Sequence, residues 1–322
     1  MNKKVGIIVG GIILLIIAGF VALKGMGGTA SVEGAGDEAE ILTVTHTLGE
    51  TPVAKNPKKV VVFELGILDA LQELGLEEVV AAVPTDSLTS YLEGFNTEDI
   101  VNVGSVKEPD MEKIYGVQPD LIIIGGRQAS LYEKLSEIAP TISMAIDNTQ
   151  YINSFRDNMT LVGELFGVEK EVEVKLQALE ENMAIVAEKV KEEDANALIT
   201  LVNDGSVNAY GNNSRFSFIN DLGFGNVDTT LEDATHGQTI SFEYILEKNP
   251  EFLFVLDRGA IMGDATPAKE IIENELVKKT QAYEKGQIVY LSPEPWYLSG
   301  GGFTSTQLML EDIATAIGAK IQ

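Results

Sequence analysis

Apolar and polar positions follow two alternating patterns along most of the chain, from about residue 60 onward. Short runs such as DLIIIGG (120–126) and FLFVL (252–256) have almost no polar interruption, which is typical of parallel strands covered on both faces. Between such runs, apolar residues recur at helical spacing, as in 66–74, where Gly75 ends the segment. This alternation predicts an α/β fold with mainly parallel sheets and right-handed crossovers.

The predicted elements fall into two similar halves. In each half a buried strand is preceded by a QPD or NPE tripeptide and followed by an arginine, which suggests two lobes of related topology. We expect an N-terminal lobe over 43–150, an interlobe helix over 151–167, and a C-terminal lobe over 168–322, with a ligand cleft between the lobes. The predicted strands are 60–63, 79–83, 120–126, 141–146, 197–203, 252–256 and 288–291, and the predicted helices are 66–74, 109–115, 130–139, 152–166, 216–222, 242–248, 269–278 and 304–317.

An uninterrupted apolar run covers residues 5–23, with lysines before and after it. Its 19 residues are just enough to span a bilayer as a helix, and the lysines at the start favour an exported remainder. We predict a transmembrane anchor in 1–24 that holds the body at the outer face of the cytoplasmic membrane. The alternative is a signal segment cleaved near 28–30, which would leave a secreted or periplasmic protein. A flexible linker rich in Gly, Ala and Glu is expected over 25–42.

The composition narrows the classes of function. The chain has 49 acidic and 23 basic residues and a formal net charge of −26, which argues against nucleic acid as a partner because phosphates require a basic face. There is no cysteine, so the protein has no disulfide, no thiolate metal site and no lipid attached through cysteine. No nucleophile–base, zinc, phosphate-loop or dinucleotide motif occurs. These features favour a binding protein over an enzyme.

Three of the four arginines in this acidic chain lie just beyond predicted strands. Arg127 and Arg258 each follow a buried strand, and Arg215 lies in a polar turn that enters a helix. Strand ends are where α/β proteins bind ligands, and guanidinium groups hold anions through several donors. The other interpretation pairs each arginine with a surface carboxylate. We expect these three to hold an anion, whereas Arg156 on the interlobe helix is interpreted as a structural or solvated charge.

Four further residues carry weaker signals. Lys107 lies in a GSVKEP loop that opens a helix, and His236 lies in an ATHG turn. Taken alone, the first is one more solvated lysine and the second a surface histidine. Trp296 and Tyr297 precede three consecutive glycines, which predicts an adaptable loop that presents aromatic rings to a ligand.

Four segments of the chain together resemble one known family. They are NPKKVVVFELGILDALQELG (56–75), NVGSVKEPDMEKI (102–114), QPDLIIIGGRQ (118–128) and WYLSGGGFTSTQLMLEDI (296–313). They are similar to the substrate-binding proteins of iron–siderophore ABC importers, and more narrowly to the binders of catecholate siderophores of the petrobactin and enterobactin type. The resemblance extends over about residues 43–322. It implies the class III periplasmic-binding-protein fold, with two α/β lobes joined by one long helix and limited closure around a shallow cleft.

The resemblance also implies a ligand and a set of contacts. The family's three arginines around a ferric tris-catecholate match Arg127, Arg215 and Arg258, and an additional lysine in some members matches Lys107. In members that take tetradentate siderophores, a histidine and a tyrosine that complete the iron shell match His236 and Tyr297. Iron would enter only as the siderophore complex, with no intrinsic cofactor and no covalent chemistry. A phenol ionises near pH 10, so Fe(III) itself would have to drive ionisation of Tyr297.

The family also implies a partner, an ABC permease met by one surface carboxylate from each lobe. Glu93 and Glu232 lie in suitable loops, and we expect a monomer. Family members usually carry a lipidated cysteine, which the apolar run at 5–23 would replace here. The main prediction is thus an extracytoplasmic receptor for a ferric catecholate siderophore. The alternatives are a binder of haem, cobalamin or a hydroxamate siderophore on the same fold, and an exported hydrolase or scaffold.

Overall fold

A computed structural model describes residues 40–231, 234, 236–263 and 266–322. The predicted anchor at 1–24 and all of the linker up to residue 39 lie outside the described residues. Within the described part, no helix is both long and apolar enough to cross a membrane.

The described chain begins with a β-hairpin that the sequence reasoning missed. Strands β1 (Ile41–His46) and β2 (Gly49–Ala54) pair antiparallel. Val44 and Val53 on this hairpin are buried, so it belongs to the folded body. The prediction that the flexible linker extends to residue 42 is therefore wrong at its end, because residues 41 and 42 lie in a strand that packs on the core.

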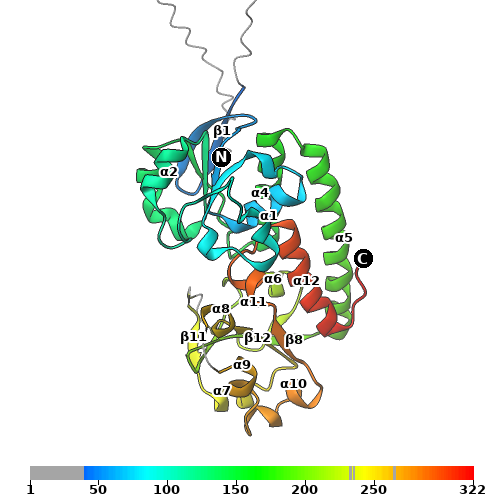
Figure 1. Cartoon of the computed structure of the whole chain (residues 1–322). Coiled ribbons are helices and arrows are strands. Elements are labelled where there is room, and N and C mark those ends of the chain that lie inside the picture. The colour runs from blue at the N-terminus through cyan, green and yellow to red at the C-terminus, as the bar shows by residue number, and fades with distance from the viewer. Residues whose placement is uncertain (1–39, 232–233, 235, 264–265) are drawn as a thin grey trace, which may run out of the picture. The chain divides into compact units, whose positions relative to one another are not determined.

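The first sheet contains five parallel strands in the order β5-β4-β3-β6-β7. Helices and short 3-10 turns connect the strands, as the alternating pattern predicted (Figure 1). The strands are β3 (Val60–Val62), β4 (Val80–Val83), β5 (Val101–Asn102), β6 (Leu121–Ile124) and β7 (Thr141–Ser143); the helices are α1 (Leu65–Glu73), α2 (Met111–Val117) and α3 (Tyr132–Ser136), with 3-10 turns η1 (Glu77–Val79), η2 (Thr85–Ser87), η3 (Ser90–Phe95) and η4 (Gly126–Leu131).

The second sheet is mixed. Its main path is β11-β9-β8-β12-β13, and β10 pairs with β8. Strands β8, β12 and β13 are parallel, as predicted, and β10 is parallel to β8, but β9 pairs antiparallel with both β8 and β11. The strands are β8 (Asn196–Asn203), β9 (Ser206–Ala209), β10 (Gly225–Asn226), β11 (Gln238–Ile240), β12 (Phe252–Asp257) and β13 (Ile288–Leu291); the helices are α6 (Ser217–Asp221), α7 (Phe242–Lys248), α8 (Gly259–Met262), α9 (Ala268–Ile272), α10 (Gln281–Glu284), α11 (Pro293–Tyr297) and α12 (Phe303–Ile317), with the 3-10 turn η5 (Val277–Lys279).

Two local signals explain the differences from the prediction in this half. Asp204 and Gly205 join β8 to β9 with φ values of 48° and 76°, and positive φ at both central residues is the requirement of the tight hairpin turn that Asp-Gly favours. The helix expected over 269–278 ends at Ile272. The side chain of Asn274 accepts hydrogen bonds from the backbone of Leu276 and Val277, and such local bonds compete with helix continuation.

Two helices connect the sheets. Helix α4 (Tyr151–Phe166) occupies the segment for which an interlobe helix was predicted, and it ends at Gly167 with a φ of 69°. The segment that continues into β8 is α5 (Glu169–Glu193), 25 residues long. Figure 1 shows α5 extending from the level of α1 and α4 to the start of β8.

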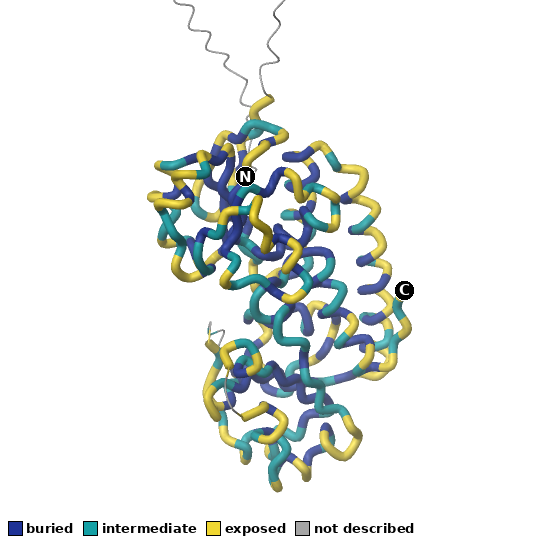
Figure 2. Tube along the Cα trace, viewed as in Figure 1, coloured by how far each residue is buried: buried dark blue, intermediate teal, exposed yellow. Residues whose placement is uncertain are grey.

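The inner faces of the two sheets share one apolar core. This cluster includes Val62 of the first sheet and Phe254 of the second, together with buried positions of α4, α5 and α12. Separate clusters cover the outer faces of the two sheets. Figure 2 shows the burial concentrated in both sheets and along one side of α5. Because the core is continuous, a large independent movement of the two sheets would expose apolar surface, which is unfavourable.

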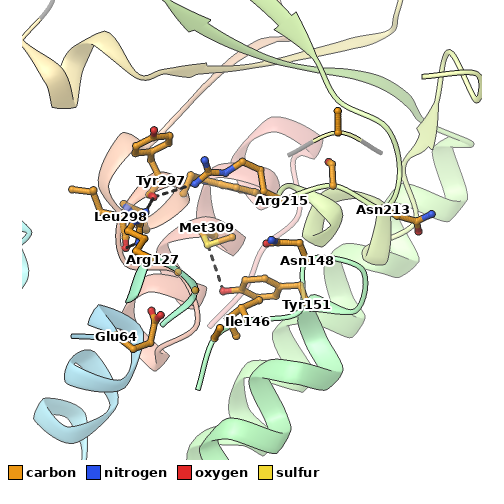
Figure 3. Close-up of a pocket in the computed structure, with 17 residues that line it drawn as sticks. Glu64, Arg127, Ile146, Asn148, Tyr151, Asn213, Arg215, Tyr297, Leu298 and Met309 are labelled. Atoms are coloured by element: carbon orange, nitrogen blue, oxygen red, sulfur yellow. Dashed lines mark hydrogen bonds between the residues drawn. The ribbon is translucent and has the colours of Figure 1, made fainter. Parts of the chain in front are cut away.

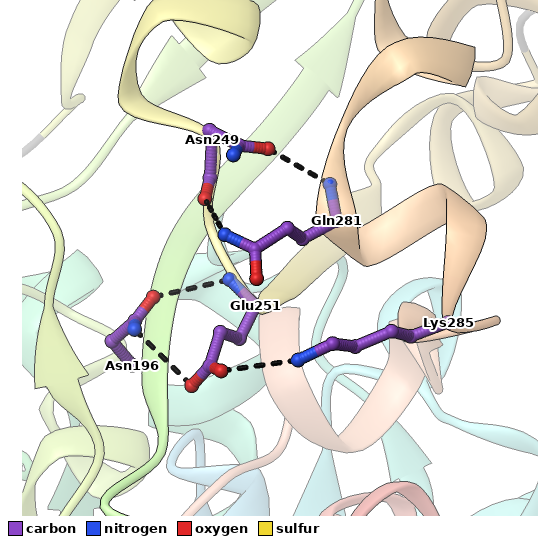
Figure 4. Close-up of polar contacts among 5 residues, drawn as sticks. All are labelled: Asn196, Asn249, Glu251, Gln281 and Lys285. Atoms are coloured by element: carbon purple, nitrogen blue, oxygen red, sulfur yellow. Dashed lines mark hydrogen bonds and ion pairs between the residues drawn. The ribbon is translucent and has the colours of Figure 1, made fainter.

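A polar network closes the amino end of the second sheet (Figure 4). Asn196, where β8 begins, donates to the carboxylate of Glu251 over 3.2 Å and accepts from the Glu251 backbone over 3.1 Å. Lys285 reaches the other oxygen of Glu251 at 3.1 Å, and Gln281 makes two bonds to Asn249. These groups satisfy one another's hydrogen-bonding capacity and hold this end of the sheet together. The side chains directed at a ligand lie at the opposite, carboxyl end.

Candidate functional site

A pocket of about 480 Å³ lies where the carboxyl ends of strands from both sheets meet (Figure 3). Its lining comes from segments far apart in sequence. They are the residues after β3, β6 and β7, the start of α4, the turn before α6, Ala234 before β11, α11 with the residues that follow it, and Met309 of α12. Its charged and aromatic lining residues include Glu64, Arg127, Tyr151, Arg215, Trp296 and Tyr297. The position agrees with the rule that α/β sheets bind ligands beyond the carboxyl ends of their strands.

Arg127 is the contribution of the first sheet. It lies in η4, directly after β6, and its side chain is exposed. Its guanidinium donates to the backbone oxygens of Tyr297 at 2.7 Å and Leu298 at 3.3 Å. Within the described residues no carboxylate lies within ion-pair distance of it, so its charge is directed at carbonyl dipoles and at the pocket.

Arg215 is the more enclosed cation. Its guanidinium carbon lies 4.4 Å from the centre of the Tyr297 ring and 5.4 Å from that of Phe216. It donates to the Tyr297 carbonyl at 3.2 Å, while its buried Nε has no hydrogen-bond partner. Burial lowers the pKa of Arg215, with Tyr297 and Tyr210 opposing that change, yet an arginine stays charged at neutral pH. An unpaired buried donor is costly and indicates a place for an acceptor on a ligand.

Arg258 follows β12, as predicted, and binds the other end of Tyr297. Its Nε donates to the Tyr297 hydroxyl at 2.7 Å, and a second nitrogen contacts the side-chain oxygen of Asn203. Asp257 was considered as its ion-pair partner, but the Asp257 carboxylate accepts instead from the backbone of Ala260 and Ala268. Arg258 is therefore not neutralised by its neighbour.

All three strand-end arginines thus meet at Tyr297. Burial alone would raise the pKa of this phenol, but the hydrogen bond from Arg258 and the charges of Arg258 and Arg215 lower it below the usual value for tyrosine. Two of the arginines, Arg127 and Arg215, line the pocket together with Tyr297, and the third lies behind the phenol. The arrangement can receive an anion with several delocalised charges.

Sequence reasoning missed one charged group of the pocket, Glu64. It directly precedes α1, beyond the end of β3, and its side chain accepts from the Gly66 amide at 3.5 Å. Burial raises the pKa of Glu64 to about 7, against opposing effects from Arg127 and the Gly66 amide. Its signal in the sequence was the one used for the arginines, namely a charged residue directly after an apolar strand.

The prediction of an adaptable aromatic loop is wrong. Trp296 and Tyr297 lie in helix α11, and the Trp296 ring packs among Phe216 and Phe218, with its Nε1 donating to Asp312 at 2.9 Å. The following glycines are tightly packed, since a Cβ on Gly302 would lie 2.4 Å from the backbone oxygen of Gly66. Trp296 still contributes to the pocket lining, so its role is that of a core residue with one side on the pocket.

The remaining predicted residues lie outside the pocket lining. Lys107 is exposed, but the residue before it, Val106, accepts a hydrogen bond from Gln128, next to Arg127, so its loop neighbours the site. His236 is exposed, two residues beyond the pocket-lining Ala234. Their roles stay predictions. Glu93 is exposed in η3, and Glu232 lies outside the described residues.

Two α/β sheets that share a pocket at their carboxyl ends, connected through a long helix, define the fold of periplasmic substrate-binding proteins. Residues 60–295 match the periplasmic binding protein family, and the chain belongs to that family. The petrobactin-binding protein YclQ of Bacillus subtilis is 39% identical over 304 residues, which cover 94% of this chain and 96% of YclQ. Its crystal structure gives a TM-score of 0.84 and covers 87% of this chain and 100% of the solved chain.

Two other relatives come from Vibrio. The ferric-anguibactin-binding protein FatB of Vibrio anguillarum is 30% identical over 279 residues, which cover 84% of this chain and 86% of FatB. The crystal structure of the periplasmic catecholate-siderophore binding protein VctP of Vibrio cholerae is 35% identical, with a TM-score of 0.81, and covers 86% of this chain and 100% of the solved chain.

Proposed function

We propose that this protein is the extracytoplasmic receptor of an ABC importer and that it captures a ferric catecholate siderophore in the arginine-lined pocket. The observation that carries the proposal is the convergence of Arg127, Arg215 and Arg258 on Tyr297 at the carboxyl ends of strands. The names of YclQ and VctP, a petrobactin binder and a catecholate-siderophore binder, support the same ligand class.

The charge of the ligand matches that of the site. Fe(III) held by three doubly deprotonated catechols carries a charge of about −3, from hard oxygen donors around a hard cation. Three guanidinium groups supply the opposite charge, and each charge-assisted hydrogen bond contributes about 1.5–3 kcal/mol. Guanidinium planes also stack on aromatic rings, worth roughly 0.5–2 kcal/mol, and Arg215 already lies over Tyr297 in this way. A neutral hydroxamate chelate would gain much less from these groups.

The other predicted contacts form part of the proposal. Lys107 would reach the chelate from its loop beside Arg127 once the ligand is bound. For a tetradentate siderophore, His236 and Tyr297 would supply the two missing iron ligands, and the lowered pKa of Tyr297 favours its phenolate. The ligand-bound protein, as two lobes over 43–150 and 168–322, would close only slightly because the sheets share a core. It would then dock on the permease through carboxylates such as Glu93 and Glu232.

The proposal places the protein outside the cytoplasm as a monomer, attached to the membrane by residues 1–24. Two relatives are named as lipoproteins, the putative ABC transporter substrate-binding lipoprotein YhfQ and the probable siderophore-binding lipoprotein YfiY, both of Bacillus subtilis. In this chain, which has no cysteine, the apolar run would take over the anchoring.

A titration of the whole chain with the ferric complex of a hexadentate tris-catecholate tests the proposal. Trp296 is the single tryptophan and lines the pocket, so its fluorescence should be quenched as the chelate binds, and calorimetry gives a non-optical check. The test variant replaces Arg127, Arg215 and Arg258 by Gln. The matched control is Arg156→Gln, because the fourth arginine pairs with Glu180 on the helix surface at 2.7 Å, outside the pocket.

We expect saturable binding by the wild type and by Arg156→Gln, and none by the triple variant. A ferric hydroxamate, haem and cobalamin serve as comparison ligands. Binding of one of these with no response to the catecholate, or unchanged catecholate binding by the triple variant, would contradict the proposal.

A further inference from the structure

The pocket that we propose to bind an anion also contains an acidic side chain. Glu64 lines the same pocket as Arg127 and Arg215, and Figure 3 shows its carboxyl group beneath Arg127. No lysine or arginine lies within ion-pair distance of it among the described residues. Its side chain accepts a hydrogen bond from the Gly66 amide at 3.5 Å, the long limit for such a bond.

The backbone around Glu64 is shaped to accept its side chain. A Cβ atom on Gly125 would lie 1.8 Å from Oε2 of Glu64, so any other residue at this position would displace the carboxyl group. Gly125 precedes η4, which carries Arg127. The same turn therefore positions the cation and makes room for the acid beside it.

An anion bound by Arg127 must come close to this carboxyl group. If Glu64 were ionised, two negative groups would share a partly dehydrated pocket, where their repulsion is much stronger than in water. A protonated carboxyl group has no charge and can donate one hydrogen bond to an anionic oxygen. A bound anion therefore disfavours the ionised form of Glu64 and stabilises its protonated form.

We propose that Glu64 is a ligand-contacting residue that takes up one proton from solvent when an anionic chelate enters the pocket, and then donates a hydrogen bond to the chelate. The inference rests on the proposed function, because it requires an anion in the pocket. It makes Glu64 a specificity-determining residue that couples capture to pH.

The groups around Glu64 agree with this role. Arg127, from η4, faces it and favours the ionised form, but burial outweighs that effect and raises the pKa of Glu64 to about 7. Across the pocket lie Arg215 from the turn before α6, Tyr297 from α11 and Tyr151 from α4. On α1 itself, Asp69 is turned away, toward the amides of Thr304 and Ser305. The carboxyl group thus changes its charge near neutral pH without a ligand, and an anion would favour the protonated form further.

The direction of the pH dependence follows from this linkage. Well below pH 7, Glu64 is already protonated in the empty pocket, so binding takes up little proton. Above pH 7 the empty pocket holds the carboxylate, and binding requires a proton. Affinity for the anionic chelate should therefore fall as pH rises, with a limiting slope of about tenfold per pH unit for one proton.

The test measures the dissociation constant of the ferric tris-catecholate for the whole chain between about pH 6.5 and about pH 8.5. The variant is Glu64→Gln, which has the same shape, has no charge and keeps a donor. The matched control is Glu78→Gln, which removes the same charge at an exposed position outside the pocket lining. Titration of the chelate itself affects all three proteins equally, so the readout is the difference in slope. Calorimetry in two buffers of different ionisation enthalpy counts the protons taken up.

We expect wild type and Glu78→Gln to weaken on the order of tenfold between about pH 7 and about pH 8.5, and Glu64→Gln to show a flatter profile. At about pH 8 the first two should take up close to one proton and Glu64→Gln close to none. Saturable binding by the wild type without proton uptake would overturn the role of Glu64 alone, and this measurement does not depend on any variant folding. Absence of saturable binding at every pH would overturn the proposed function, and the inference with it.

Discussion

The two walls of the pocket hold their arginines in different ways. On the wall after the first sheet, Arg127 is exposed and is held by two backbone carbonyls. On the wall after the second sheet, Arg215 and Arg258 are partly buried and lie against the ring or hydroxyl of Tyr297. Because Arg127 is exposed, its guanidinium can exchange its carbonyl partners for groups of a ligand, whereas the other two are packed against Tyr297. Preorganised groups lose less freedom on binding, so Arg215, which lines the pocket from the second wall, should contribute most to affinity, and Arg127 on the first wall should adapt to the shape of the ligand.

The largest expected effect is that of Arg215→Gln. It removes a central cation whose Nε has no partner in the empty pocket, together with the stacking on Tyr297. We expect affinity for the ferric tris-catecholate to fall on the order of a hundredfold, about 3 kcal/mol, as measured by calorimetry. A loss of affinity smaller than that caused by Arg127→Gln would contradict the proposed difference between the two walls.

Arg127→Gln should weaken binding about tenfold, the low end for loss of a charge-assisted bond, because its guanidinium is exposed to solvent and already bonded to two carbonyls in the empty pocket. The effect should also vary more between ligands of different shape than that of Arg215→Gln. A panel of ferric catecholates with different backbones tests this. A constant factor across the panel would show that Arg127 is as rigid as the second wall.

Arg258→Gln should act mainly through Tyr297. Since the hydrogen bond and charge of Arg258 lower the pKa of this phenol, the substitution should raise it, and affinity should change only about threefold, near the lower range for a single hydrogen bond. Ultraviolet difference spectra across alkaline pH follow the phenolate, and Tyr297→Phe identifies its signal. If Tyr297 ionises at the same pH in Arg258→Gln as in the wild type, Arg258 does not lower the pKa of this phenol and does not belong with Arg215 on the second wall.

The last expected effect, that of Glu64→Gln, concerns the stability of the empty protein and not its affinity for the ligand. The pKa of Glu64 is about 7 in the folded state and about 4.3 in an unfolded chain. The folded state therefore binds the proton more tightly, and its stability decreases as pH rises between these values. The variant should match the wild type near pH 4 and have a clearly higher Tm near pH 8, where ionisation of Glu64 has cost the wild type about 3–4 kcal/mol of stability. Equal melting at both pH values would contradict burial as the cause of the raised pKa.

Strong periodic signals predicted most of the fold. Continuous apolar runs indicated β6 and β12, and helical spacing indicated α4 and α12, because these patterns arise directly from burial on two faces or on one. The hairpin β1–β2 was missed although ILTVTH is rich in β-branched residues, because it directly follows the expected linker and its partner strand GETPVA contains a proline. The early end of α9 depends on a single asparagine side chain, which a period-based analysis does not detect.

The site could be predicted only in part, for a different reason. Arg127, Arg215 and Arg258 are rare residue types at strand ends, so position and scarcity together singled them out. Glu64 also follows an apolar strand, but it is one of 49 acidic residues, so its residue type did not single it out, and its place beside Gly125 appears only in the folded structure. The sequence did not indicate the core position of Trp296, because the glycines that follow it are typical of a flexible loop. In the structure these glycines allow close packing against α1.

The most direct test of the central claim is a crystal structure of the protein with the ferric tris-catecholate, in which the anomalous signal of iron locates the ligand. We predict a single iron peak in the pocket, with catecholate oxygens within hydrogen-bond distance of Arg127 and Arg215. The same map would show whether Lys107 and His236 move toward the ligand. An iron peak outside this pocket, or a chelate in it that contacts none of the three arginines, would contradict the account.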